Sequence, residues 1–230
     1  MAGAIQVSLP VWPPVEPLCG RGLIRQVPED FVVEERVDIE LEGEGEHLWV
    51  QLRKRGQNTE YVAAQLARLC EVPRRAVGYA GRKDRHAVTT QWFSVHLPGK
   101  QGPGDWTALP ESVEVLQTAR HRRKLQTGAL KANRFRLVIR DLTGEPDQIE
   151  SRLERLARRG VPNYFGEQRF GHGGRNVERA HEWFAGEFRP RDRSLRSLLL
   201  SSARSFLFNE VLAARVRADS WDRVLPGEVL

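Results

Sequence analysis

Apolar residues recur at every second position in several short segments of this chain. In the clearest segment, Leu48, Val50 and Leu52 are each separated by one residue, which is the period of a strand with one buried face. The other strand candidates are residues 31–35, 77–80, 89–96 and 134–140. Strands that are interleaved with helices and joined by long connections predict an α+β fold.

Two helices have clear end signals. Asn58 can cap a helix that runs to Leu69, and Pro146 opens a second helix that Gly160 can end. After Gly160 the sequence becomes rich in glycine and aromatic residues, and the pattern is mostly helical from residue 197 to 219. We therefore predict an irregular leader, an α+β domain and a third region, with the ranges 1–20, 21–160 and 161–230.

Positive charge is concentrated in one part of the chain. The net charge is +6, but the segment from Arg120 to Arg140, here called the basic stripe, has eight Lys and Arg residues and no acid. Such a concentration is typical of a surface that binds phosphate backbones. In the alternative interpretation these cations are a solvated face and Phe135 belongs to the core. We favour the first interpretation because no acid interrupts the run.

Other classes of protein find little support. The two cysteines form no C-x-x-C pair, and the six histidines lack the spacings of metal-binding motifs. The N-terminus lacks the pattern of a signal peptide, and no apolar stretch is long enough to span a membrane. We expect a cytoplasmic protein without a metal site and without a membrane segment.

Asp84 is the first candidate for chemistry. It lies among Arg82, Lys83 and Arg85 in a loop between two predicted strands. Such a loop is often only a solvated turn, in which Asp and Gly are ordinary. In the functional interpretation the neighbouring cations keep the carboxylate ionised, which suits a nucleophile better than a general base. The spacing gives Arg25 no functional role, and it leaves the segment 161–171 undecided between packing and RNA contact.

Taken together, several segments resemble the tRNA pseudouridine synthase D family. The resemblance is collinear from about residue 20 to the end of the chain, and the set of motifs is far more specific than any one of them. The segments that carry it are residues 28–35 (PEDFVVEE), 43–47 (GEGEH), 54–59 (KRGQNT), 78–84 (GYAGRKD) and 161–171 (VPNYFGEQRFG).

The resemblance implies an isomerase that converts uridine at position 13 of tRNA to pseudouridine without cofactor or metal. Asp84 matches the nucleophilic aspartate of the family, and Asn133 and Phe135 match an N-x-F motif whose aromatic ring lies against the target base. Arg25 falls where the family has a basic residue able to pair with the aspartate. We expect a monomer that binds tRNA, and the remaining substrate-binding candidates are Lys83, Lys124, Arg134 and Arg136.

Two features depart from the family pattern. Ala132 stands where the family commonly has glycine, which puts the local backbone conformation in doubt. Family members also continue beyond residue 230, so we expect a pseudouridine synthase catalytic domain whose inserted, family-specific domain is incomplete. A non-catalytic RNA-binding fragment is therefore the alternative function. A metal-dependent nuclease ranks last, because the clustered acids at 40–46 show no paired ligand pattern.

Overall fold

The computed structural model describes residues 9–228 and divides the chain into two compact units. Residues 21–143 form the first, here called the sheet unit, and the flanking segments up to residue 20 and from residue 144 form the second, the helical unit. The first eight residues of the predicted leader lie outside the described residues. These units are defined by contacts within the structure, whereas the boundary predicted near Gly160 separates two domains of the family. The structure therefore does not test that boundary, which stays a prediction.

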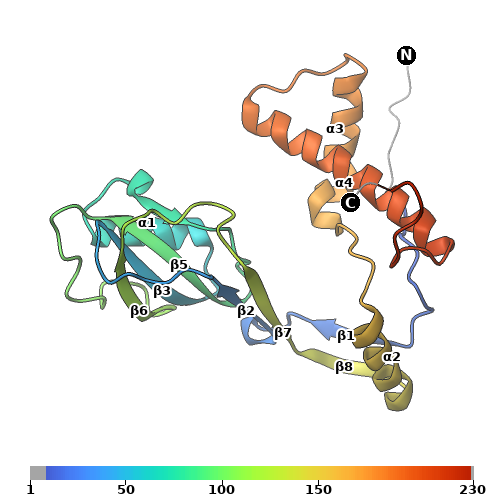
Figure 1. The fold of residues 1–230 in the computed structure, drawn as a ribbon, viewed down its shortest axis with the longest axis horizontal. Helices are drawn as coiled ribbons and strands as arrows, with labels where there is room; N and C mark the ends of the chain where they lie inside the picture. Colours follow the sequence, from blue (N-terminus) through green and yellow to red (C-terminus); the bar gives the residue numbers. More distant parts are fainter. Residues whose placement is uncertain (1–8, 229–230) are drawn as a thin grey trace. The chain divides into compact units, whose positions relative to one another are not determined.

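The sheet unit contains a six-stranded mixed sheet, and the α+β fold class is confirmed (Figure 1). The strands lie in the order β6-β3-β5-β2-β7, and β4 pairs with β5 off this path. β2 and β5 are parallel, whereas the other pairs in this sheet are antiparallel. The strands are β2 Phe31–Arg36, β3 His47–Arg55, β4 Val77–Tyr79, β5 Val88–His96, β6 Val113–His121 and β7 Ala132–Leu137.

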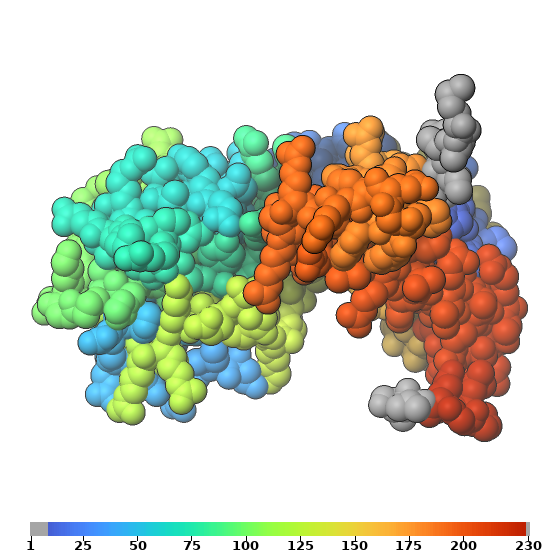
Figure 2. Space-filling model, turned by 90° about the horizontal axis from the view of Figure 1, so that it is seen from above, coloured from blue at the N-terminus to red at the C-terminus, as the bar shows by residue number. Residues whose placement is uncertain are grey.

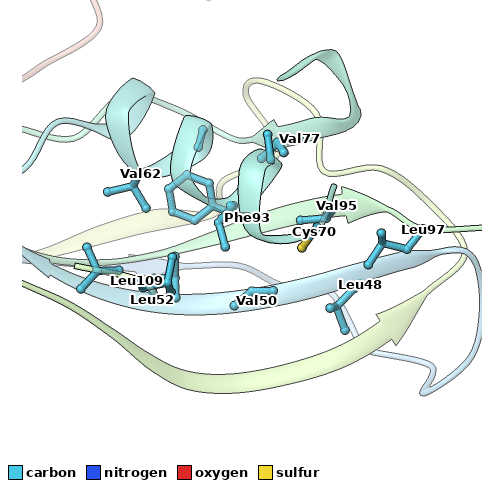
Figure 3. Packing of buried hydrophobic residues seen from close by; sticks show 14 residues of the cluster. Leu48, Val50, Leu52, Val62, Cys70, Val77, Phe93, Val95, Leu97 and Leu109 are labelled. Carbon is cyan, nitrogen blue, oxygen red and sulfur yellow. The ribbon is translucent and has the colours of Figure 1, made fainter. Parts of the chain in front are cut away.

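The core of the sheet unit lies between the sheet and α1, Thr59–Leu69 (Figure 3). Leu48, Val50 and Leu52 of β3 point into it, as their alternation predicts. At the start of α1, the side chain of Asn58 accepts a hydrogen bond from the backbone N–H of Tyr61 at 2.7 Å, so the predicted cap is confirmed. The central strand β5 is flanked by β3 and β2 in the sheet, and its buried apolar residues pack in the same core as those of α1.

The basic strand predicted over residues 134–140 is broken in two. β7 ends at Leu137, the N–H of Val138 bonds the carbonyl of Asp30 at 2.8 Å, and β8 (Ile139–Gly144) pairs with β1 (Gly20–Ile24) in a separate two-stranded sheet. The apolar residues of this segment are not core: Phe135 is 59% exposed. The core interpretation was wrong because alternation shows two faces of a strand but not what covers either face.

In the described part of the helical unit the α-helices are α2 (Pro146–Arg159), α3 (Arg175–Phe184) and α4 (Arg193–Arg217), and two short 3-10 helices, Glu167–Phe170 and His172–Gly174, precede α3. α3 and α4 pack side by side in both views (Figures 1 and 2). α2 begins at Pro146 and is followed by Gly160 with φ 81°, as the end signals predict. Among the helices that the structure describes, none combines the length and the apolar character needed to cross a membrane.

The glycine-rich segment 161–171 is held by packing within the helical unit. Asn209 of α4 is fully buried, and its amide bonds both the N–H and the carbonyl of Phe165 at 2.9 Å. Phe170 is also fully buried, and Tyr164 stacks on Trp12 with ring centroids 5.9 Å apart. These contacts account for the aromatic residues of the segment as packing residues.

Candidate active site

Asp84 lies in the loop between β4 and β5. Its carboxylate is partly open to solvent, with 34% of the side chain exposed, and lies 3.6 Å from the guanidinium of Arg25. Among the described residues, Arg25 is the only one with an ion pair to this carboxylate. The loop is therefore not a freely solvated turn at this residue, because an arginine from a segment nearly sixty residues earlier in the chain faces it.

The position of Arg25 depends on an unusual backbone conformation. Its φ is 58°, in the left-handed region that residues with a Cβ rarely adopt. The guanidinium carbon lies 4.5 Å from the centroid of the Phe31 ring, so a cation–π contact also holds the side chain. Because left-handed non-glycine residues cost free energy and gather at functional sites, this backbone marks Arg25 as a candidate site residue.

Asp30 holds the turn that follows Arg25. Its carboxylate is buried and accepts hydrogen bonds from the N–H groups of Gln26 and Val27 at 3.1 and 3.2 Å. Arg140 donates three further hydrogen bonds to the same carboxylate, at 2.7 to 3.1 Å. The hydrogen bonds from Arg140 hold the pKa of Asp30 below its ordinary value. Arg140, although part of the basic stripe, therefore forms an ion pair that stabilises this turn.

Lys54, at the end of β3, contacts the backbone of Asp84 from inside the protein. The side chain is fully buried, and its ammonium donates to the carbonyls of Gln57 at 2.5 Å and of Asp84 at 3.0 Å. Burial lowers the pKa of Lys54 to about 8, although the nearby charge of Asp84 opposes the shift. The ammonium faces the backbone of Asp84, and the carboxylate remains available to Arg25.

Glu35, near the end of β2, anchors the preceding residue. One carboxylate oxygen lies 2.8 Å from the ammonium of Lys83, and the other accepts the N–H of Trp92 at 2.7 Å. The side chains of Glu35 and Lys83 are 0% and 6% exposed. Lys83 therefore points into the protein, and this geometry does not support its predicted role in binding substrate, which stays untested.

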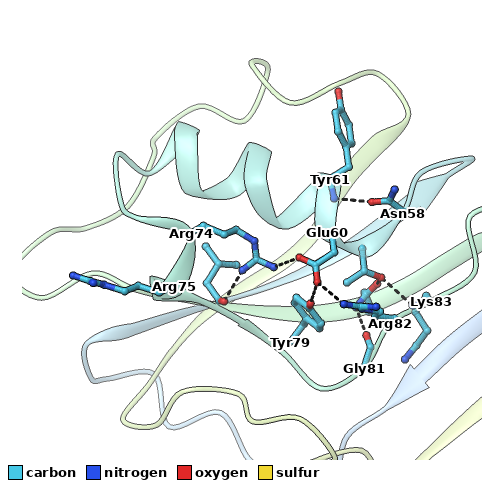
Figure 4. A network of polar contacts seen from close by, with 12 residues as sticks. Asn58, Glu60, Tyr61, Arg74, Arg75, Tyr79, Gly81, Arg82 and Lys83 are labelled. Atoms are coloured by element: carbon cyan, nitrogen blue, oxygen red, sulfur yellow. Dashed lines mark hydrogen bonds and ion pairs between the residues drawn. The ribbon is translucent and has the colours of Figure 1, made fainter. Parts of the chain in front are cut away.

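The rest of the loop is also tied to its surroundings. Glu60, in the first turn of α1, accepts hydrogen bonds from Arg74, from Arg82 and from the hydroxyl of Tyr79 (Figure 4). The hydroxyl of Thr59 accepts the N–H of Lys83 at 2.9 Å. A loop with this many fixed backbone and side-chain groups presents Asp84 in one defined position.

The N-x-F motif lies on the same face of the sheet as these anchors. Directly paired residues of neighbouring strands share a face, and Lys54, Thr89, Val33 and Phe135 form one such row across four strands. In the next row Asn133 pairs with Glu35. The exposed ring of Phe135 stacks on the ring of Phe31, with ring centroids 6.1 Å apart, and the guanidinium of Arg25 also contacts the Phe31 ring.

Arg134 and Arg136 lie on the opposite face of the sheet. They pair with Glu34 and Val32, and line a pocket of about 480 Å³ together with Arg53 and Glu29. The structure thus groups Asn133 and Phe135 with the Asp84 loop but separates Arg134 and Arg136 from it. Their contact with substrate stays a prediction, and such a contact would be made on the face opposite to the Asp84 loop.

Ala132, at the start of β7, needs no glycine conformation. It pairs with Arg36 in the sheet, and its φ is not in the left-handed region. Lys124 lies elsewhere, where its ammonium donates to the carbonyl of Arg75 at 2.7 Å, and it lines a pocket with His47 and His96. Since β3 begins at His47 and Lys54 is seven residues further on, this pocket is about 23 Å along the strand from the Asp84 loop.

The basic stripe is less positive in the folded chain than in the sequence. Arg122 pairs with Glu42 and Glu44, two of the clustered acids at residues 40–46, and Lys131 pairs with Asp38 at 2.7 Å. These acids lie about eighty to ninety residues earlier in the chain. The stripe contains no acid in the sequence, but the fold brings acids from elsewhere in the chain beside it, and its predicted role in binding RNA stays a prediction.

Sequence reasoning missed Lys54 and Glu35. Each one is the next member of an apolar row: Lys54 follows Leu52 two residues on, and Glu35 follows Val33 in the same way. A charged residue at a position where the alternation predicts burial was the available signal, because buried charges are rare unless they are paired. Arg25 had no local signal, since its ion-pair partner, Asp84, is distant in sequence.

Comparison with known proteins identifies the family of the chain. A family model described as tRNA pseudouridine synthase D matches residues 17–180. The chain belongs to the tRNA pseudouridine synthase D family. This match includes every candidate residue named above.

Curated relatives give the same family. The tRNA pseudouridine synthase D of Methylococcus capsulatus is 56% identical over 209 residues, which are 90% of this chain and 59% of that protein. The tRNA pseudouridine synthase D of Nitrosococcus oceani is 52% identical over 216 residues, which are 94% of this chain and 60% of that protein. The chain thus spans about 60% of the length of these relatives.

A solved structure supports the fold. The crystal structure of a Methanosarcina mazei protein, provisionally described as a tRNA pseudouridine synthase D, superposes with a TM-score of 0.68 at 23% identity. The match covers 97% of this chain and 66% of that chain. At this identity the likeness establishes the shared fold.

Proposed function

We propose that this chain carries the catalytic aspartate of a tRNA pseudouridine synthase, and that it acts on the uridine at position 13 of tRNA. The observation that carries the proposal is the pairing of Asp84 with Arg25, in which a carboxylate that is one-third exposed faces a guanidinium at 3.6 Å. Membership of the family supports it, and so does the activity that the names of the relatives state.

The reaction rearranges the atoms of one nucleotide. The bond between N1 of uracil and C1′ of ribose breaks, the base rotates, and a bond forms between C5 and C1′, while C5 loses a proton and N1 gains one. Asp84 is the nucleophile or base for the first step, by attack on C6, by attack on C1′, or by removal of a ribose proton. Arg25 orients the carboxylate and balances its charge. The isomerisation is redox-neutral and every atom stays in the nucleotide apart from exchangeable protons, so the proposed reaction needs no oxidant, reductant or second substrate, and the proposal invokes no metal and no cofactor.

The target uridine must leave the stacked RNA before it can react, at a cost of about a few kcal/mol. Phe135 offers an exposed ring on the face of Asp84, and stacking of a base on an aromatic ring is worth about 1–3 kcal/mol. In this proposal the Asn133 amide bonds a polar group of the displaced nucleotide. Arg134, Arg136 and Lys124 contact phosphates of the tRNA away from the reacting base.

The test is to incubate the 230-residue chain with unmodified tRNA, measure its affinity for the tRNA, quantify pseudouridine, and map its position. We expect binding and conversion at position 13. Binding without conversion would assign the chain the alternative, non-catalytic RNA-binding role, and conversion at another uridine would contradict the position. We further propose that the chain works as a monomer in the cytoplasm, and sedimentation at assay concentrations tests the oligomeric state.

A further inference from the structure

The buried charges beneath the Asp84 loop form an arrangement that the proposed chemistry does not use directly. β5 is the central strand, with β3 on one side and β2 on the other. Each flanking strand has one buried charged residue near its own C-terminal end, at a position that continues an apolar row. These residues are Lys54 on β3 and Glu35 on β2. The two charges are opposite in sign, and both engage the loop that leads into β5.

We propose that Lys54 and the Glu35–Lys83 pair are positioning residues that hold the backbone of Asp84 so that its carboxylate meets Arg25. Lys54 binds the carbonyl of Asp84 itself, at 3.0 Å. The carboxylate of Glu35 accepts a hydrogen bond at 2.8 Å from the ammonium of Lys83, the residue that directly precedes Asp84. This inference rests on the proposed function, because it assigns these residues an effect on the step that Asp84 carries out.

The burial of these groups makes a purely stabilising role a poor explanation. A buried ion pair is weak support for stability, because the cost of removing two charges from water offsets their attraction. Lys54 has no ion-pair partner among the described residues, and its ammonium donates only to the carbonyls of Gln57 and Asp84. Its contribution is directional, since it fixes where the Asp84 carbonyl lies.

A small displacement of the loop is enough to matter for catalysis. A misplacement of a reacting group by about 1 Å can cost about 100-fold in rate. The backbone on both sides of Asp84 is tied down, by Thr59 at the N–H of Lys83 and by Gly56 at the carbonyl of Ala87. Loss of the central tie at Lys54 therefore leaves a loop that stays attached at its ends but moves at Asp84.

The experiment compares Lys54→Met with Arg68→Met, the same change at an exposed cation of α1 that contacts neither the Asp84 loop nor the pocket of Arg134 and Arg136. We expect Lys54→Met to lower the single-turnover rate of pseudouridine formation about 100-fold with unchanged affinity for tRNA. Backbone hydrogen exchange of residues 80–87 should rise at an unchanged rate of global unfolding. The control should match the wild type in all three measurements.

A second variant covers the case in which Lys54→Met does not fold. The double variant Glu35→Gln with Lys83→Gln removes both charges of the buried pair together, and its control is Glu154→Gln with Arg158→Gln, which removes both charges of an exposed pair on α2. The double variant should show the same combination of a lower rate, unchanged tRNA affinity and faster local exchange.

The results separate this inference from the proposed function. Wild-type rate and wild-type exchange of residues 80–87 in Lys54→Met, or in the double variant if Lys54→Met does not fold, would overturn the positioning role. If the wild-type chain forms no pseudouridine, the proposed function fails, and the exchange measurement alone decides the positioning role: unchanged exchange overturns it and faster exchange supports it.

Discussion

Two groups of charged residues in the sheet unit behave in opposite ways. Around the Asp84 loop, Lys54 and Glu35 are buried and bind specific atoms of the backbone or of Lys83. Along the basic stripe, Arg134 and Arg136 are exposed and are positioned by their strand alone. Buried charges set geometry because they are desolvated and directional, whereas exposed charges act through a screened field. Three predictions test this division, and a fourth tests the uncharged ring of Phe135 on the same face as the Asp84 loop.

The buried ammonium of Lys54 should be visible as a dependence of stability on pH. Its pKa is lowered from 10.5 to about 8, so between these values the unfolded chain binds more protons than the folded chain. The stability of the wild type relative to Lys54→Met should be constant below pH 8. It should then rise by about 3 kcal/mol as the pH increases to 10.5.

This is measured by urea unfolding of both proteins at a series of pH values, and the difference between them removes the other titrating groups. A difference that stays flat from pH 8 to 10.5 would show that Lys54 is not desolvated as the structure has it.

Phe135 lies on the Asp84 face of β7, and its ring is open to a partner. Phe135→Ala should lower turnover by about 10- to 100-fold, because base stacking is worth about 1–3 kcal/mol. The salt dependence of tRNA binding should not change, since stacking releases no counterions. Turnover equal to that of the wild type would remove Phe135 from the site.

Arg140 belongs to the basic stripe in sequence, but in the structure its half-exposed side chain pairs with the buried carboxylate of Asp30. Arg140→Met leaves the buried carboxylate of Asp30 without its cation, so the variant should lose more thermal stability than any other single substitution of an arginine in the stripe. Because the pKa of Asp30 is lowered by Arg140, this stabilisation is present above the ordinary value of 3.8 and is lost as the pH falls below it. A melting curve like that of Arg134→Gln would contradict the assignment.

Arg134 and Arg136 should affect binding through charge alone. Replacement of either by Gln should reduce the slope of log K against log salt for tRNA binding by about one unit if it contacts a phosphate. The rate of the bound complex should stay unchanged, because both residues lie on the face opposite to Asp84. An unchanged slope would mean that this face does not meet RNA.

The sequence alone predicted those parts of the fold that depend on interactions between residues close together in the chain. The cap at Asn58, the strand around Leu48 and the helix that Gly160 follows all depend on residues a few positions apart. β1 and β6 were not predicted, because Gly20–Ile24 and Val113–His121 lack a clean alternation and exist through pairing with distant strands.

The site was accessible only in part for the same reason. The motif around Asp84 is contiguous, but its partners reach it from β2, from β3 and from the turn at Arg25. The break at Val138 depends on a hydrogen bond to Asp30, more than a hundred residues earlier. The neutralisation of Arg122 depends on Glu44, 78 residues earlier. Such contacts follow from the topology of the sheet, which no local pattern encodes.

The most direct test of the account is the single-turnover conversion of uridine by Asp84→Asn, measured beside the affinity of the same variant for tRNA. The exchange of carboxylate for amide keeps the size of the side chain and the buried ties to the backbone. The account predicts tRNA binding close to that of the wild type and no detectable pseudouridine. Pseudouridine formed at the wild-type rate would contradict it.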